Sequence, residues 1–144
     1  MKKLISKNEK DTYKIAADIA SQLRGGEIIA LEGDLGAGKT NFTKGLAKAF
    51  NIKKHITSPT FVLMKMYEVK SQKSKVNKLI HVDAYRLDEP QELFYLGIEE
   101  YLNNPETIVV IEWADKIKEY LRKFENIIWI KIELNEKDRL YKIM

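Results

Sequence analysis

Eight consecutive residues carry the strongest chemical signal in the chain. They run from Gly33 to Thr40 and read Gly-Asp-Leu-Gly-Ala-Gly-Lys-Thr, which fits the pattern G-x-x-x-x-G-K-[ST]. Glycines let such a loop curl so that successive backbone N–H groups point at a phosphate, and the following helix adds the positive end of its dipole. The pattern predicts a nucleotide-binding loop in which Lys39 bridges the β- and γ-phosphates and the hydroxyl of Thr40 binds Mg²⁺.

A loop of this kind needs an acidic residue at the end of a nearby strand, because Mg²⁺ prefers octahedral coordination by oxygen. Two apolar runs end in a suitable carboxylate, Ile108 to Glu112 and Leu79 to Asp83. The first run is the cleaner match, so we predict that Glu112 completes the metal site. Asp83 is expected either to position water or to support the metal ligands without binding the metal itself. For either acid, the structural alternative is a strand-end carboxylate that caps a helix or pairs with a lysine.

The absence of GTPase motifs bears on whether the nucleotide is ATP or GTP. A GTPase would carry D-x-x-G after a strand and N-K-x-D for the guanine edge, and residues 79–115 contain no D-x-x-G. Residues 135–138 have the letters of N-K-x-D in the wrong order. ATP is therefore favoured over GTP. The segment 57–60 follows the loop's helix, where related proteins place a switch that senses the γ-phosphate, although a simple turn would have the same composition.

Helical and strand patterns alternate around these residues. Asp11 and Thr12 are predicted to cap a first helix that ends at Gly25. Further helices are expected at 39–50, 90–94, 98–102 and 114–124, and strands at 27–32, 61–69, 79–83, 107–113, 126–134 and 140–143. The expected fold class is α/β: a three-layer, P-loop NTPase-like fold with a mixed, mainly parallel central sheet.

Composition limits the class of protein further. The 144 residues are 44% hydrophobic and 32% charged, which predicts one folded domain over 1–144. No apolar run approaches the length of a membrane span, and the start of the chain lacks the apolar core of a secretory signal, so we expect a cytoplasmic protein without membrane contact. With no cysteine and two histidines, any metal should be hard and oxygen-bound.

Positive charge is concentrated in one segment. Residues 65–78 hold five lysines and one acid, a net charge of +4 that equals the formal net charge of the whole chain. Such a segment is typical of a solvated hairpin tip, and a contact with nucleic acid is the functional alternative.

Five motifs together resemble a known family. They are the loop at 33–40, Ser-Pro-Thr at 58–60, His-Val-Asp-Ala-Tyr-Arg-Leu at 81–87, the segment from Glu92 to Leu102, and Glu112-Trp113. In this order and spacing they resemble the TsaE family, also called YjeE, the small P-loop ATPases of bacterial tRNA threonylcarbamoyladenosine synthesis. The resemblance implies that ATP hydrolysis serves a complex of a threonylcarbamoyl-transferase subunit, TsaD, and its paralogous partner, TsaB. That complex modifies the tRNA adenosine 3′ to the anticodon, so tRNA would be an indirect partner.

The resemblance also implies site residues. Thr40 and Glu112 would hold Mg²⁺, Asp83 would be needed for hydrolysis, and Trp113 would shape the site beside Glu112. Lys39, Asp83 and Glu112 are the predicted catalytic residues. With the loop, the predicted nucleotide-binding residues are Thr12, Asp34, Leu35, Gly36, Ala37, Gly38, Lys39, Thr40, Thr60, Trp113 and Arg139.

Alternatives remain for individual residues and for the function. Thr12 would otherwise be a helix cap, Arg139 a surface charge and Trp113 a packed core residue.

A small-molecule kinase uses the same loop but usually has clustered arginines, and the four here are scattered along the chain. A non-hydrolysing module, in which ATP binding gates docking to a partner, is the other alternative. Because the chain has no evident catalytic glutamine, hydrolysis by the isolated protein is expected to be slow and to rise when partners order the 57–60 segment and Asp83.

Overall fold

The computed structural model describes residues 1–59, 62–70 and 74–144. Its strands are β1 (Lys2–Ser6), β2 (Ile28–Glu32), β3 (Met64–Glu68), β4 (Lys78–Asp83), β5 (Thr107–Glu112), β6 (Ile127–Asn135) and β7 (Asp138–Ile143). The α-helices are α1 (Glu9–Gln22), α2 (Lys39–Ala49), α3 (Gln91–Tyr95) and α4 (Lys118–Leu121), with short 3₁₀ helices at Ile98–Glu100 and Ala114–Ile117.

The seven strands form one sheet in the order β1-β7-β6-β2-β5-β4-β3. The four central strands, β6, β2, β5 and β4, run parallel, and β3, β7 and β1 add antiparallel strands at the two sides. The predicted α/β fold with a mixed central sheet is confirmed. Because β2, β5 and β4 are parallel neighbours, their carboxyl ends meet at one edge of the sheet, where α/β folds place their ligands.

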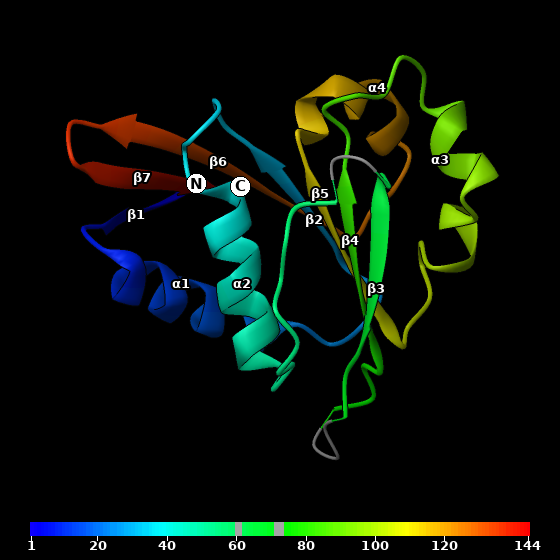
Figure 1. Ribbon diagram of the computed structural model, residues 1–144, viewed down its shortest axis with the longest axis horizontal. Coiled ribbons are helices and arrows are strands. Elements are labelled where there is room, and N and C mark those ends of the chain that lie inside the picture. The colour runs from blue at the N-terminus through cyan, green and yellow to red at the C-terminus, as the bar shows by residue number, and fades with distance from the viewer. Residues whose placement is uncertain (60–61, 71–73) are drawn as a thin grey trace.

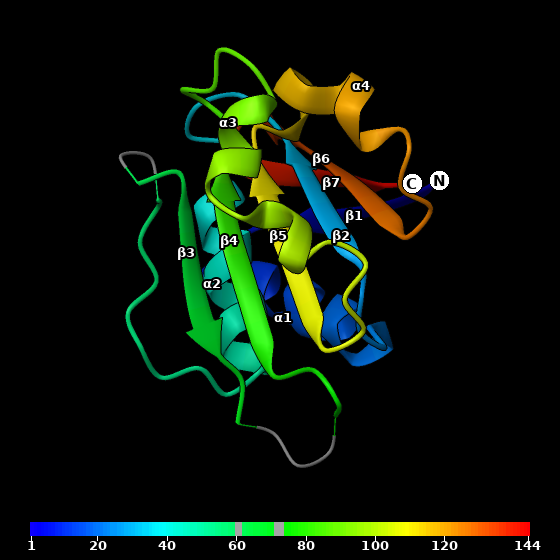
Figure 2. The same cartoon turned by 90° about the vertical axis from the view of Figure 1, so that its right-hand side faces the viewer.

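Helices cover both faces of the sheet (Figures 1 and 2). On one face α1 and α2 pack against the strands, and Ala16, Phe42 and Leu46 lie in that core. On the other face α3, α4 and the 3₁₀ helices cover a second core that includes Ile98 and Leu121. All six residues of β5 are buried, as expected for a strand covered on both sides. The three-layer arrangement buries β2 between helices on both faces, and the chain passes from its end to the start of α2.

Several predicted boundaries were wrong. The first helix begins at Glu9 rather than beside Asp11 and Thr12, because the side chain of Asn8 accepts a hydrogen bond from the Asp11 N–H and caps it. The helix predicted at 114–124 is a 3₁₀ turn followed by α4, which ends at Leu121. The helix predicted at 98–102 is a 3₁₀ turn. The strand predicted at 61–69 is observed from Met64 to Glu68, and residue 61 lies outside the described part of the chain.

The first strand, β1, was not predicted. It pairs antiparallel with β7, so that Lys2 lies opposite Ile143 at the other end of the chain. Its mostly exposed residues have little apolar alternation. Because β1 is stabilised by pairing with a strand at the other end of the chain, its own residues give only a weak indication of a strand. None of the helices in the described ranges is long and apolar enough to cross a membrane.

Close packing of α1 against α2 depends on Gly45. A Cβ built on Gly45 would lie 2.7 Å from the Cβ of Ala16 and 3.1 Å from a ring carbon of Tyr13. Helix propensity alone predicts that Gly45→Ala stabilises the protein by about 1 kcal/mol. We expect the opposite sign, a loss of about 1–3 kcal/mol in urea unfolding, because the methyl group overpacks the interface. Lys48→Ala, on the exposed side of the same helix, is the control, and a stabilised Gly45→Ala would contradict the packing argument.

Candidate nucleotide site

The predicted loop joins the end of β2 to the start of α2, as its motif requires. Gly36 and Gly38 have φ angles of 82° and 111°, which glycine adopts without the steric cost that other residues meet. A Cβ on Gly33 would lie 2.7 Å from the carbonyl oxygen of Ile132. The loop is closed by a hydrogen bond of 3.0 Å from the Ala37 N–H to the Asp34 carbonyl. Leu35, at the tip, is 85% exposed. Five of the predicted binding residues, 34–38, thus form one curled loop at the N-terminus of a helix, the arrangement that binds anions.

Lys39 lies under this loop with only 5% of its surface exposed. Its ammonium donates hydrogen bonds to the carbonyl oxygens of Gly33 and Asp34, the second at 2.9 Å. The ring of Trp113 covers it, with Nζ 3.9 Å from the ring centroid. Burial lowers the pKa of Lys39, and nearby carboxylates, Glu112 foremost, partly offset that effect. A poorly hydrated cation held between oxygens and a ring is well placed to exchange those partners for an anionic ligand.

The two predicted metal ligands are in direct contact. Thr40 Oγ1, in the first turn of α2, donates a hydrogen bond of 2.9 Å to Oε1 of Glu112 at the end of β5. A hydroxyl and a carboxylate are the hard oxygen donors that Mg²⁺ selects. Across residues 1–59, 62–70 and 74–144, no three or more His, Asp or Glu side chains gather in a way that could hold a metal. Mg²⁺ commonly keeps water and phosphate oxygens among its ligands, so a pair of protein oxygens such as these is compatible with it.

Asp83 ends the neighbouring strand, directly opposite Glu112 in the β4–β5 register. Its two carboxylate oxygens are held separately. Ser58 Oγ donates to Oδ2 at 2.8 Å, and the backbone N–H of Tyr85 donates to Oδ1 at 2.9 Å. Ser58 belongs to the segment predicted to act as a switch, so this segment and Asp83 are physically linked. Thr60, the predicted switch residue, lies outside the described residues.

Trp113 follows Glu112 directly and has a left-handed backbone, with φ of 59°. Besides covering Lys39, its indole contacts the ring of Tyr85, with centroids 4.8 Å apart. It also packs against the second core. Trp113 therefore both contacts core residues, as the packing alternative expects, and borders the cavity beside Glu112. Around these groups lies a cavity of about 440 Å³ lined by Leu35, Gly36, Gly38, Lys39, Thr40, Asn41, Lys44, Ser58, Asp83, Tyr85, Glu112 and Trp113.

Thr12 and Arg139 lie on the other side of the loop. They line a smaller hollow of about 190 Å³ that shares Gly36, Gly38 and Asn41 with the larger cavity. Arg139 Nη2 lies 3.4 Å from the Gly36 carbonyl oxygen, to which it donates a hydrogen bond. The hydroxyl of Thr12 contacts Ser6 Oγ at 2.7 Å and Tyr141 at 3.4 Å. The helix-cap alternative for Thr12 is wrong, since Asn8 caps α1.

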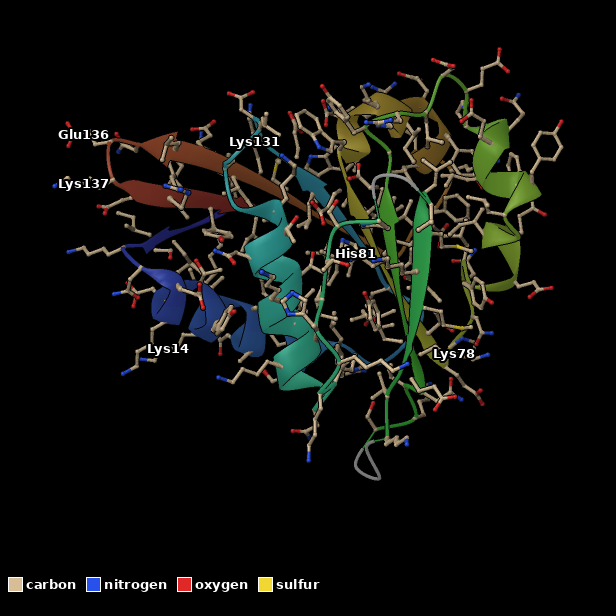
Figure 3. All side chains as sticks on the ribbon, in the orientation of Figure 1. Lys14, Lys78, His81, Lys131, Glu136 and Lys137 are labelled. Atoms are coloured by element: carbon tan, nitrogen blue, oxygen red, sulfur yellow. The ribbon has the colours of Figure 1, made fainter. Side chains whose placement is uncertain are left out.

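Sequence reasoning assigned no role to His81. Its ring is fully buried within β4, and Nε2 contacts Oε2 of Glu112. Figure 3 shows His81 inside the molecule, whereas Lys14 and the turn at Glu136 and Lys137 lie at its surface. The available signal was a histidine inside an otherwise apolar strand, two residues before Asp83. Alternation along a strand puts residues two apart on the same face, but it does not identify which side chain of the next strand they meet.

Residues 6–141 match the family model described as "Threonylcarbamoyl adenosine biosynthesis protein TsaE". This chain belongs to the TsaE family. The tRNA threonylcarbamoyladenosine biosynthesis protein TsaE of Aquifex aeolicus is 41% identical to it over 120 residues, or 82% of this chain and 80% of the relative. The TsaE of Rickettsia felis is 39% identical over 143 residues, or 98% of this chain and 78% of the relative.

A solved structure has a similar fold. The crystal structure of YdiB from Bacillus subtilis superposes with a TM-score of 0.76 at 30% identity, covering 99% of this chain and 83% of that chain. The TsaE of the same organism's strain 168 is 40% identical over 114 residues, or 79% of this chain and 67% of the relative. The resemblance inferred from five motifs is confirmed over residues 6–141 of this chain.

Proposed function

We propose that this TsaE protein is a Mg²⁺-dependent ATP-binding and ATP-hydrolysing subunit for threonylcarbamoyladenosine modification of tRNA. It would act in the cytoplasm on the complex of TsaD and TsaB, which modifies the adenosine 3′ to the anticodon, rather than on tRNA itself. One observation carries the proposal: the contact of Thr40 with Glu112 lies beside Lys39 and the curled glycine loop. The groups proposed to bind phosphate and metal therefore line one cavity.

Each side chain has a definite task in the proposed reaction. The loop amides and Lys39 bind the β- and γ-phosphates and offset the negative charge that develops during transfer. Thr40 and Glu112 would hold Mg²⁺, which supplies further neutralisation of phosphate charge when bound. Thr12 and Arg139 line the hollow on the far side of the loop, which would take the nucleoside end of ATP.

Asp83 is proposed to orient the attacking water. Its carboxylate is held on both sides by Ser58 and the Tyr85 amide, so its orientation depends on where the 57–59 segment lies. Movement of that segment would change the position of Asp83. This link supports slow hydrolysis by the isolated protein and faster hydrolysis when TsaD and TsaB hold the segment.

The test is phosphate release from MgATP by the purified protein, alone and with TsaD and TsaB. We expect slow release alone, a rise of about tenfold or more with both partners, and loss of release when EDTA removes Mg²⁺. Unchanged turnover in a complex that demonstrably forms would overturn the partner-stimulation part. Bound ATP with no release in any condition would favour the ATP-gated module, and phosphate appearing on an added acceptor would favour a kinase.

A further inference from the structure

His81 has an environment that core packing does not explain. It shares β4 with Leu79, Ile80 and Val82, and its side chain is fully buried. Nδ1 has no hydrogen-bond partner among the residues that the structure describes. A buried polar atom left unpaired costs about 1–3 kcal/mol, and a leucine at this position would avoid that cost. Apolar packing alone therefore does not account for a histidine at this position.

The contact made by Nε2 supplies an explanation. Nε2 lies against Oε2 of Glu112, whose other oxygen, Oε1, accepts from Thr40. Since a carboxylate only accepts hydrogen bonds, the proton of the imidazole must be on Nε2. With Nδ1 unpartnered, the tautomer protonated on Nε2 satisfies the contact without burying an unpaired N–H. The two oxygens of Glu112 therefore accept from different donors, Oε1 from Thr40 and Oε2 from His81.

We propose that His81 is a positioning residue that holds Oε2 of Glu112 away from the cavity and presents Oε1 beside Thr40. The carboxylate would then offer one oxygen, in a fixed orientation, to a bound Mg²⁺. Residues that orient metal ligands in this way commonly change metal affinity or activity by about 10- to 100-fold when mutated. The inference rests on the proposed function, because it assigns His81 to the proposed Mg²⁺ site.

Two variants separate positioning from packing. His81→Leu fills a similar space without a donor, and His81→Gln keeps an N–H at nearly the reach of Nε2. ATP affinity is measured by calorimetry with Mg²⁺ and with EDTA, and kcat and the melting temperature are measured alongside. We expect His81→Leu to reduce the Mg²⁺-dependent gain in ATP affinity about tenfold or more while affinity in EDTA stays within about twofold. His81→Gln should recover most of the gain. His55→Leu, at the exposed second histidine, is the control.

A Mg²⁺-dependent gain that survives in His81→Leu would overturn the proposal, as would equal loss in the Leu and Gln variants at similar melting temperatures. If the wild-type protein shows the gain but releases no phosphate, hydrolysis fails as a function while the affinity measurements still decide the role of His81. A further readout needs neither ATP nor metal. The ¹⁵N spectrum of the free protein should show His81 protonated on Nε2, with a proton signal that moves in Glu112→Gln, and a proton on Nδ1 would refute the arrangement.

Discussion

Replacing Glu112 with glutamine is expected to reduce Mg²⁺-dependent ATP hydrolysis about 100-fold or more. The carboxylate is 3% exposed and lies between Thr40 and His81. Glutamine keeps the shape of the side chain and one oxygen but removes the negative charge that would hold the cation. Phosphate release, measured against Mg²⁺ concentration, should require far more metal in the variant, and ATP affinity in EDTA should be nearly unchanged.

The fold should survive this substitution. The glutamine amide can still bond to the Thr40 hydroxyl, which both donates and accepts, while the glutamine oxygen accepts from His81. Glu119→Gln is a matched control, because Glu119 is exposed on α4 and its side chain pairs only with Arg122 among the contacts described. If Glu112→Gln retained hydrolysis within about threefold of wild type, Glu112 would have no part in the metal site.

Replacing Lys39 with methionine is expected to separate activity from stability. The variant keeps the length and apolar stem of the side chain but removes the cation that would contact the phosphates. We expect phosphate release to fall about 100-fold or more, with weaker ATP binding. Because burial lowers the pKa of Lys39, its charged form is disfavoured in the folded protein. The free energy of unfolding should therefore fall by less than about 1 kcal/mol, or rise, despite the loss of the bonds to Gly33 and Asp34.

The control is Lys48→Met, further along the same helix, where the ammonium is exposed and lies 5.4 Å from the ring centroid of Tyr13. Urea unfolding and phosphate release are measured on both variants. A large loss of stability in Lys39→Met would mean that the lysine mainly supports the loop structure. Retained activity would exclude Lys39 as the phosphate-binding cation.

Much of the candidate site was predictable because its signals are local. The glycine loop, Lys39 and Thr40 are contiguous, and the geometry of a strand, a tight turn and a helix specifies where each group points. Glu112 and Asp83 were identified as the polar ends of apolar strands. Their position side by side follows once β4 and β5 are parallel neighbours, since parallel strands end at the same edge of a sheet.

The TsaE sequence by itself thus determined the loop, its two candidate carboxylates, the α/β class and the family, all through contiguous patterns and their order. Only the tertiary structure decided that β1 pairs with β7, that Asn8 rather than Asp11 or Thr12 caps α1, and that His81 contacts Glu112. It also brought Thr12 and Arg139, which are 127 residues apart, to one side of the loop. The reason is physical: these contacts join residues far apart in sequence, and the register and packing that create them belong to the whole chain rather than to any segment of it.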